Sequence, residues 1–307
     1  MEVVERHFRV MASEAVVILN GGDVATAGAA EQRLRFLEAS WSRFLPESDI
    51  THLNDAGGAF VDVQPETVQL IRVMIEAWEF TAGRYDPTLL PNLICAGYIS
   101  SIDDPSRRTR LNALTRSGPL SAIELDMQHS RVRIPAELSL DAGGIGKGFA
   151  GDLVVAEMLA RGVPGVLVSI GGDVVVGGEP PELAGWSVGV QNPFRPSEDL
   201  VTLLVRSGAV CTSSTQSRRW ISDGLEMHHL IDPATGIPST SSLATVTAVA
   251  SAGWIAEAHA KAALLEGDPD AIRWLDSHGV AGVVVRHDGT FVQSSALTTA
   301  TTIGAQI

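Results

Sequence analysis

Apolar side chains recur at helical spacing in several segments of the chain. Within residues 25–44 they follow one another mostly at steps of three, four and seven, with charged side chains between them. This spacing places the apolar side chains on one face of a helix. Comparable patterns predict helices over 25–44, 65–81, 149–161, 254–266 and 271–277.

Short apolar or alternating segments predict strands between these helices. The uninterrupted apolar run at 166–170 is typical of a central strand, and three later segments are spaced like a meander. Residues 50–54 are interpreted as a turn, and the charged segment 103–117 as a surface connection. Strands are expected at 8–19, 59–63, 123–126, 131–134, 166–170, 174–176, 186–190, 200–205, 209–212, 244–250, 280–286 and 291–294.

The composition is that of a well-packed globular protein. The 307 residues are 45% hydrophobic and 19% charged. The formal net charge of −14, with no local cluster of Lys and Arg, argues against a nucleic-acid-binding protein. No apolar stretch is long enough for a membrane span.

The N-terminus and the cysteines bear on the cellular compartment. The first residues are acidic where a signal peptide would be basic, so we expect a cytoplasmic protein. The two cysteines, Cys95 and Cys211, are too few and too far apart for a disulfide framework. We interpret them as reduced, buried thiols.

A glycine-rich stretch at 139–148 separates an extended segment from a predicted helix. It reads Ser-Leu-Asp-Ala-Gly-Gly-Ile-Gly-Lys-Gly. Glycine lets the backbone approach a ligand closely, and a helix that starts there offers free N–H groups to an anion. The spacing fits neither the dinucleotide fingerprint nor the P-loop. Two interpretations stay open: a phosphate cradle with Lys147, and a tight turn whose lysine faces water.

Two further loops carry polar side chains. The turn at 83–88 carries an aromatic ring, a carboxylate and a hydroxyl. It is either a loop that holds a ligand or a proline turn capped by its Asp. His228 and His229 are adjacent, and side chains that follow one another on a strand point to opposite faces, so one of them is expected to be structural. Asp232 begins an Asp-Pro-Ala-Thr-Gly turn, which its carboxylate either caps or leaves for a ligand.

Six short motifs follow one another along the chain. They are Phe44-x-Pro46-x-Ser48-x-Ile50-x-x-Leu53-Asn54, Tyr85-Asp86-Pro87-Thr88, Asp141-x-Gly143-Gly144-Ile145-x-Lys147-Gly148, Gly171-Gly172-Asp173, His228-His229-x-Ile231-Asp232-Pro233-x-Thr235-Gly236 and Ala256-Glu257-Ala258. Each motif alone is weak, but their order and spacing are hard to obtain by chance. With them the chain resembles the ApbE family of FAD:protein FMN transferases over nearly its whole length.

This resemblance implies a fold and an activity. The fold is α+β, a T-fold-like, two-lobed flavin-binding architecture with mixed and antiparallel sheets and flanking helices, and we expect residues 1–307 to form a single domain of this kind. FAD is held in a cleft between the lobes. The reaction moves the FMN moiety of FAD to a Thr or Ser hydroxyl of an acceptor flavoprotein that carries a flavinylation motif, and releases AMP. Magnesium is the usual cofactor.

The resemblance also implies roles for individual residues. His229, Asp232 and Lys147 match catalytic positions, with His229 as the hypothesised base for the acceptor hydroxyl. Magnesium is expected at the backbone carbonyl of Gly144 and at Glu257. The residues expected to hold FAD are Met11, Ser13, Tyr85, Asp86, Thr88, Asp141, Gly143, Gly144, Lys147, Gly171, Gly172, Asp173, His229 and Lys261.

Four positions depart from the family pattern. Glu257 and Lys261 stand where the family usually has the magnesium ligands Asp and Thr, and Met11-Ala12-Ser13 replaces Met-Gly-Thr. Glutamate can bind magnesium through one oxygen, but its extra methylene displaces the ligand, and a protonated lysine cannot be a ligand. A helix-surface ion pair between Glu257 and Lys261 is the plain alternative. We favour the hypothesis that the Lys261 ammonium replaces part of the metal charge at the diphosphate.

Two other functions stay compatible with these residues. One is a protein that binds, stores or senses FAD without transfer. The other is an FAD pyrophosphatase, in which water takes the place of the acceptor hydroxyl.

Overall fold

The computed structural model describes residues 2–110, 115–182, 184–222, 224–298 and 303–304. The chain forms two compact units. The first unit comprises residues 1–34, 147–217 and 240–307, and the second comprises residues 35–146 and 218–239. The single-domain organisation over 1–307 stays a prediction. In the described part of the chain, no helix has the length and apolar character needed to cross a membrane.

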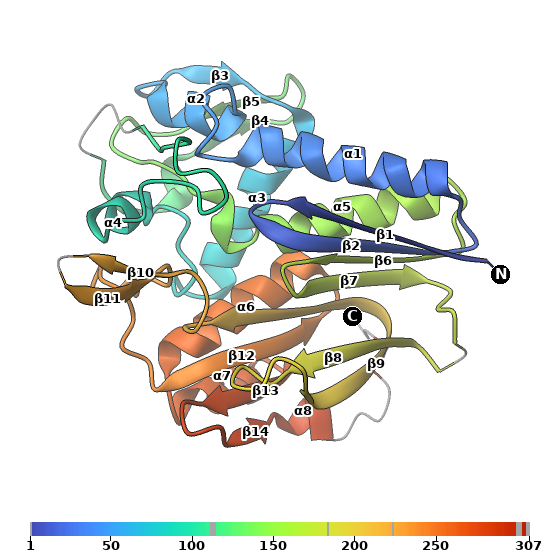
Figure 1. Cartoon of the computed structure of the whole chain (residues 1–307). Coiled ribbons are helices and arrows are strands. Elements are labelled where there is room, and N and C mark those ends of the chain that lie inside the picture. The colour runs from blue at the N-terminus through green and yellow to red at the C-terminus, as the bar shows by residue number, and fades with distance from the viewer. Residues whose placement is uncertain (1, 111–114, 183, 223, 299–302, 305–307) are drawn as a thin grey trace. The chain divides into compact units, whose positions relative to one another are not determined.

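Within the described residues, the first unit is built on a ten-stranded sheet (Figure 1). Its main path runs β1-β2-β6-β7-β9-β12-β13-β14, and β8 and β15 also pair with β9. These pairs are antiparallel except for β15 with β9. The strands are β1 (Val3–Val10), β2 (Ser13–Asn20), β6 (Gly165–Ile170), β7 (Asp173–Gly178), β8 (Trp186–Gln191), β9 (Asp199–Ser214), β12 (Leu243–Ala250), β13 (Ala281–Arg286), β14 (Phe291–Gln293) and β15 (Ile303–Gly304).

Helices accompany this sheet. Helix α6 packs against β9 and β12, and its alanines allow a close approach because Ala256, Ala260 and Ala263 are fully buried. The helices of the first unit are α5 (Gly146–Ala160, in this unit from Lys147 onward), α6 (Gly253–Glu266), α7 (Asp270–Ser277) and α8 (Ser295–Thr298), and α1 (Val24–Trp41) continues into the sequence of the second unit.

The N-terminal segment forms a hairpin of β1 and β2, where the apolar pattern predicted one strand over 8–19. Met11 and Ala12 make the turn with φ angles of 52° and 53°, and Val10 pairs with Ser13. Two-residue hairpin turns need positive φ and usually contain Gly, Asn or Asp. Because this turn contains none of these residues, the sequence carries no turn signal, and the single strand was a wrong prediction.

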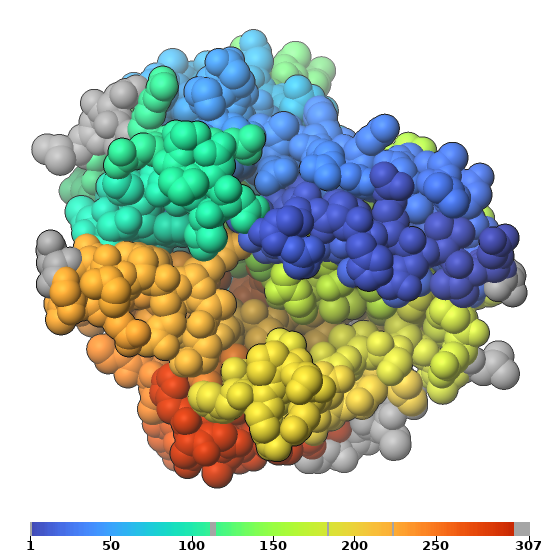
Figure 2. Space-filling view, viewed as in Figure 1, coloured from blue at the N-terminus to red at the C-terminus, as the bar shows by residue number. Residues whose placement is uncertain are grey.

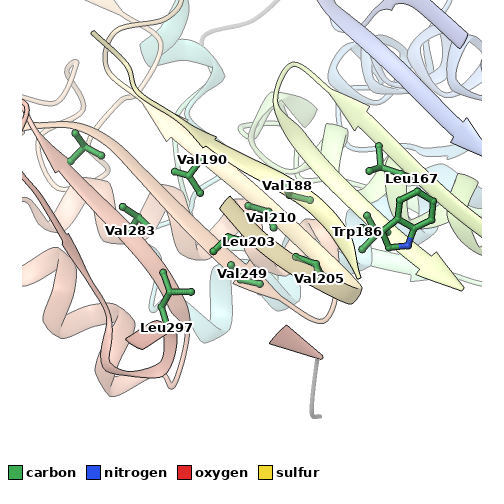
Figure 3. Close-up of a cluster of buried hydrophobic side chains, with 12 residues drawn as sticks. Leu167, Trp186, Val188, Val190, Leu203, Val205, Val210, Val249, Val283 and Leu297 are labelled. Atoms are coloured by element: carbon green, nitrogen blue, oxygen red, sulfur yellow. The ribbon is translucent and has the colours of Figure 1, made fainter. Parts of the chain in front are cut away.

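Strand β9 is one strand of 16 residues, where two strands were predicted. Its first half pairs with β8, and its second half lies between β7 and β12. Gly208 lies between the halves with a φ of 107°, which favours glycine. The side chains of Val188 on β8 and Leu203 on β9 join the buried apolar cluster of the unit, which Figure 3 shows in close-up.

The second unit consists of short helices and two small antiparallel sheets. One sheet has the order β3-β5-β4, and the other is the hairpin of β10 and β11, which lies in the orange surface of the space-filling view (Figure 2). The elements are α2 (Asp49–Asp55), β3 (Phe60–Asp62), α3 (Pro65–Phe80), α4 (Leu90–Cys95), the 3₁₀ helix η1 (Leu120–Ala122), β4 (Glu124–Asp126), β5 (Arg131–Arg133), the 3₁₀ helix η2 (Ala142–Gly144), β10 (Arg219–Ser222) and β11 (Leu225–His228).

Two expectations about the second unit need correction. Residues 50–54, predicted as a turn, lie in α2, because the Ser48 hydroxyl accepts a hydrogen bond from the Thr51 N–H at 3.1 Å and caps the helix. Cys211 of the first unit is buried as expected, whereas Cys95 at the end of α4 is exposed. Of the predicted connection 103–117, residues 111–114 lie outside the described residues.

Candidate functional site

Lys147 is the second residue of α5, and its ammonium contacts two buried carboxylates of the first unit. Its Nζ donates to Glu257 Oε1 at 2.9 Å and to Asp173 Oδ2. Asp173 and Glu257 are 3% and 5% exposed, whereas the lysine side chain is 18% exposed. Buried carboxylates need a counter-charge. The lysine supplies it from the solvent-reaching side of the cluster.

The backbone around β7 and β9 orients Asp173. This residue follows Gly171 and Gly172, whose φ angles of 61° and 89° favour glycine. Its Oδ1 accepts a hydrogen bond from the backbone N–H of Thr212 at 3.0 Å. The second oxygen is thereby directed to the lysine.

Ser13, the first residue of β2, lies close to the same cluster. A Cβ built on Gly171 would come within 2.8 Å of Ser13 Oγ and within 3.8 Å of Lys147 Cδ. Ser13 Oγ donates to the carbonyl of Met11 at 3.3 Å, so the strained turn of the hairpin also bears on its position. The first unit therefore brings Ser13, Gly171 and Lys147 together, and Met11 joins them through its hydrogen bond with Ser13. That these residues form one FAD site stays a prediction.

Glu257 uses both of its carboxylate oxygens. Oε1 faces Lys147, and Oε2 accepts a hydrogen bond from the backbone N–H of Gly148 at 2.7 Å. Lys261 lies one helical turn further along α6 and is partly buried. The formal charges of the Asp173 and Glu257 carboxylates and the Lys147 ammonium sum to one negative charge. The positive charge of Lys147 is thus already paired with Asp173 and Glu257 when an anionic ligand binds.

Predicted ligand residues of the second unit gather at the loop 85–88. Asp86 Oδ1 accepts from the N–H of Thr88 at 2.8 Å and from its hydroxyl at 2.7 Å, and the Thr88 hydroxyl accepts from Gly118 N–H at 3.1 Å. Burial raises the pKa of Asp86, although the Thr88 hydrogen bonds lower it. Tyr85 is 1% exposed. The loop is held by its own side chains, as the Asp-cap alternative expected.

The glycine-rich stretch contacts this loop and a buried arginine. The backbone N–H of Asp141 donates to the Pro87 carbonyl at 2.9 Å, and its Oδ1 accepts from Gly143 N–H at 3.1 Å. The same oxygen lies 3.5 Å from Nε of Arg43. Gly144 ends the 3₁₀ helix η2 that follows. Of the predicted stretch, Asp141, Gly143 and Gly144 belong to the second unit, whereas Lys147 belongs to the first.

Arg43 is a buried cation among aromatic rings. Its guanidinium carbon lies 4.2 Å from the ring centroid of Phe44 and 4.8 Å from that of Tyr98. It donates to the Tyr98 carbonyl at 3.1 Å and to the Thr109 hydroxyl. Burial lowers the pKa of Arg43, and the charge of Asp141 raises it. Tyr98 in turn stacks on Trp220 with centroids 5.2 Å apart.

A pocket of about 600 Å³ opens beside this arginine in the second unit. Three of its lining residues, Arg107, Arg108 and Arg110, are exposed arginines of the charged connection. Arg107 also pairs with Asp104 at 3.2 Å. The pocket is therefore suited to an anionic group.

The histidine pair and Asp232 take distinct places in the second unit. His228 Nε2 lies 2.9 Å from the Ser239 carbonyl, and its Nδ1 accepts from Leu230 N–H at 3.2 Å, so His228 has backbone partners on both ring nitrogens. Asp232 Oδ1 accepts from Arg84 Nη1 and from Ala234 N–H, each at 2.9 Å. Asp232 thus caps its turn. His229 is partly buried, and its role as a base stays a prediction.

Comparison with known proteins places this chain in a family. A model of the ApbE family matches residues 7–284. The chain belongs to the ApbE family. It is 29% identical over 245 residues to an FAD:protein FMN transferase of Klebsiella pneumoniae, covering 78% of this chain and 75% of the relative. It is 27% identical over 239 residues to one of Treponema pallidum, covering 72% of this chain and 66% of the relative.

Solved ApbE structures share the fold. The ApbE protein of Thermotoga maritima superposes with a TM-score of 0.84 at 23% identity, over 97% of this chain and 99% of that one. The flavin transferase ApbE of Vibrio cholerae gives a TM-score of 0.77 at 17% identity, again over 97% and 99% of the two chains. The predicted α+β ApbE fold class, with antiparallel sheets and flanking helices, is confirmed.

Two residues of this ApbE-family chain were missed by the sequence reasoning. Arg43 directly precedes the first motif, and only its burial among rings reveals it. Asp152 on α5 accepts from the N–H groups of Gly253 at 2.7 Å and Trp254 at 3.1 Å. The pKa of Asp152 is raised to about 7: burial raises it most, the hydrogen bonds from those two donors lower it, and the charge of Glu257 raises it. The available sequence signal for Asp152 was its position four residues after Gly148, which places it one helical turn beyond the glycine-rich motif.

Proposed function

We propose that this ApbE-family chain binds FAD and transfers its FMN moiety to a Thr or Ser hydroxyl of an acceptor flavoprotein, with release of AMP. Support comes from the curated relatives, which are named FAD:protein FMN transferases. The observation that carries the proposal is the ammonium of Lys147, held at the start of α5 by two buried carboxylates. We further propose a cytoplasmic location, as the sequence predicts.

The proposed reaction is a phosphoryl transfer. The acceptor oxygen forms a bond to the phosphorus of the FMN moiety, the bond from that phosphorus to the AMP oxygen breaks, and the hydroxyl proton passes to a base, for which we propose His229. Such transfers depend on positioning and on neutralising the charge of the phosphate oxygens. Lys147, with Lys261 as a second cation, supplies the neutralising charge in this proposal.

The residues at Glu257 do not fit a magnesium ion. One carboxylate oxygen is 2.9 Å from the Lys147 ammonium and the other 2.7 Å from the Gly148 N–H. The expected Thr is replaced by Lys261, and a protonated lysine cannot be a ligand. Among the described residues, no three His, Cys, Asp or Glu side chains are grouped to hold a metal. We therefore propose that the chain binds FAD without a metal at Glu257.

A mixture of purified chain, FAD and an acceptor protein carrying a flavinylation motif tests the proposal. We expect AMP release and covalent flavin on the acceptor in equal amounts, with and without chelator. The same acceptor with its motif Thr changed to Val should remain unlabelled. Turnover that requires magnesium would refute the metal-free site, and FMN with AMP in the absence of acceptor would indicate a pyrophosphatase.

A second candidate function is FAD binding without transfer. It is favoured by the net negative charge of the cluster formed by Lys147, Asp173 and Glu257, since this cluster neutralises phosphate charge less well than a divalent cation. In that case the purified protein binds FAD and no AMP appears with any acceptor.

A further inference from the structure

Helices α5 and α6 meet at their first turns through two glycines. A Cβ added to Gly148 would lie 2.4 Å from the carbonyl carbon of Gly253, and one added to Gly253 would lie 2.4 Å from the carbonyl oxygen of Gly148. Such distances exclude any side chain at either position. The two backbones are therefore in direct contact.

Each helix places a carboxylate against the free N–H groups of the other. Asp152 of α5 accepts from Gly253 and Trp254, the first two residues of α6. Glu257 of α6 accepts from Gly148 near the start of α5. Asp152 is four residues after Gly148, and Glu257 is four residues after Gly253, so the arrangement is reciprocal.

This reciprocal capping replaces the usual cap. The residue before α6 is Ala252, which has no side chain that could accept a hydrogen bond. The first N–H groups of a helix are otherwise unsatisfied, and a carboxylate is favourable there. Asp152 therefore fixes where α6 begins relative to α5.

The site depends on that relative placement. Glu257 lies one turn into α6, and its two oxygens bridge Gly148 and Lys147 of α5. A slip of α6 along α5 would separate Glu257 from Lys147 and leave the lysine to Asp173. The capping is thus connected to the orientation of the ammonium.

We propose that Asp152 is a positioning residue for the pair of Lys147 and Glu257, acting through the first turn of α6. It does not contact substrate in this role. The part of the test that uses FAD rests on the proposed function, whereas the part that follows Gly148 does not.

The experiment compares Asp152→Ala and Asp152→Asn in the full-length chain. Asn retains an oxygen for the Gly253 N–H, whereas Ala retains none. Asp23→Ala is the matched control, because Asp23 Oδ1 accepts from Thr26 N–H at 2.7 Å at the start of α1 in the same unit. The readouts are the amide-hydrogen exchange of Gly148, followed by NMR, and the dissociation constant and transfer kinetics of FAD.

We expect Asp152→Ala to speed exchange at Gly148 at least tenfold and to weaken FAD binding about tenfold. For Asp152→Asn, the Gly148 exchange rate and the dissociation constant of FAD should both stay within about threefold of the parent values. Asp23→Ala should change neither quantity. Unchanged Gly148 exchange in Asp152→Ala would overturn the positioning role. If exchange changes but the parent chain binds no FAD, the positioning role holds and the proposed function fails.

Discussion

Each unit holds a cation, and the two do so by different means: the Lys147 side chain is partly buried, whereas Arg43 is buried. Lys147 in the first unit is paired with two carboxylates, whereas Arg43 in the second has one carboxylate at 3.5 Å and two aromatic faces. An ammonium is a compact charge that opposite charges compensate. A guanidinium is planar, less strongly hydrated, and can use its faces as well as its N–H groups.

This difference has a functional consequence. The lysine cluster is held by charge, so it responds to any change in the charge of its members. The arginine cluster is held mainly by shape and stacking, so it responds to changes in ring contacts. Substitutions that separate charge from shape therefore distinguish the two.

The largest effect is expected for Lys147→Met. It leaves two buried carboxylates without their counter-charge, and breaking a buried pair in this way costs about 3 kcal/mol or more in free energy of unfolding. FAD binding should also be lost. Urea unfolding and flavin-fluorescence titration measure the two effects.

The control for Lys147→Met is Arg161→Met, which removes a cation from the exposed pair with Glu157 just after α5. Exposed pairs contribute little, so unfolding should hardly change. The double variant with Glu257→Gln should recover part of the stability lost. Equal losses in the single and double variants would show that charge does not hold this cluster.

The next effect is expected for Arg43→Lys, which retains the charge and removes the planar fork. Loss of the stacking on Phe44 and Tyr98 and of the hydrogen bonds should lower the free energy of unfolding by about 2 kcal/mol. Lys147→Arg is the matched exchange in the other unit. If Arg43→Lys were neutral, then charge alone would account for Arg43 and the comparison would fail.

The sequence predicted the five longer helices α1, α3, α5, α6 and α7 and most strands, because apolar periodicity and glycine turns are local signals. It assigned Met11, Ser13, Gly171 and Lys147 to one expected FAD site only through the family resemblance. The partners of Lys147 were not predictable, because Asp173 and Glu257 lie 26 and 110 residues away and meet it only through the sheet. The turn at Met11 and the burial of Arg43 were missed for the same reason, since tertiary contacts impose both.

A third group, the carboxyl of Asp152 on α5, sharpens the comparison, because its charge depends on whether it holds a proton near neutral pH. Its pKa is raised to about 7 in the fold, mainly by burial. The folded state therefore binds this proton more tightly than the unfolded chain, and the contribution to stability falls as pH rises from about 4 to about 7. Asp152→Asn should flatten this decline, as urea unfolding across that range measures.

The comparison variant is Asp23→Asn. Hydrogen bonds from the Thr26 side chain and backbone lower the pKa of Asp23, so its contribution is present above about pH 4 and lost below it. This variant should therefore leave the change in the free energy of unfolding between pH 4 and 7 as it is in the parent chain. If Asp152→Asn and Asp23→Asn changed the pH dependence of unfolding equally, Asp152 would not be the cause of the decline in stability.

The smallest effect on the pH dependence of stability is expected for His259 on α6, whose ring is neutral when it is buried. Burial, together with the charge of His278, lowers its pKa to about 4. The neutral ring accepts from Trp274 Nε1 at 3.3 Å. Its contribution to stability is complete above about pH 6.5 and is lost as pH falls towards 4.

The opposite pH dependences of the Asp152 and His259 contributions to stability partly cancel in the parent chain. His259→Gln should expose the fall caused by Asp152 and steepen the overall decline of stability from pH 4 to 6.5, whereas exposed His7→Gln should not. An unchanged slope in His259→Gln would show that this ring is not neutralised by burial.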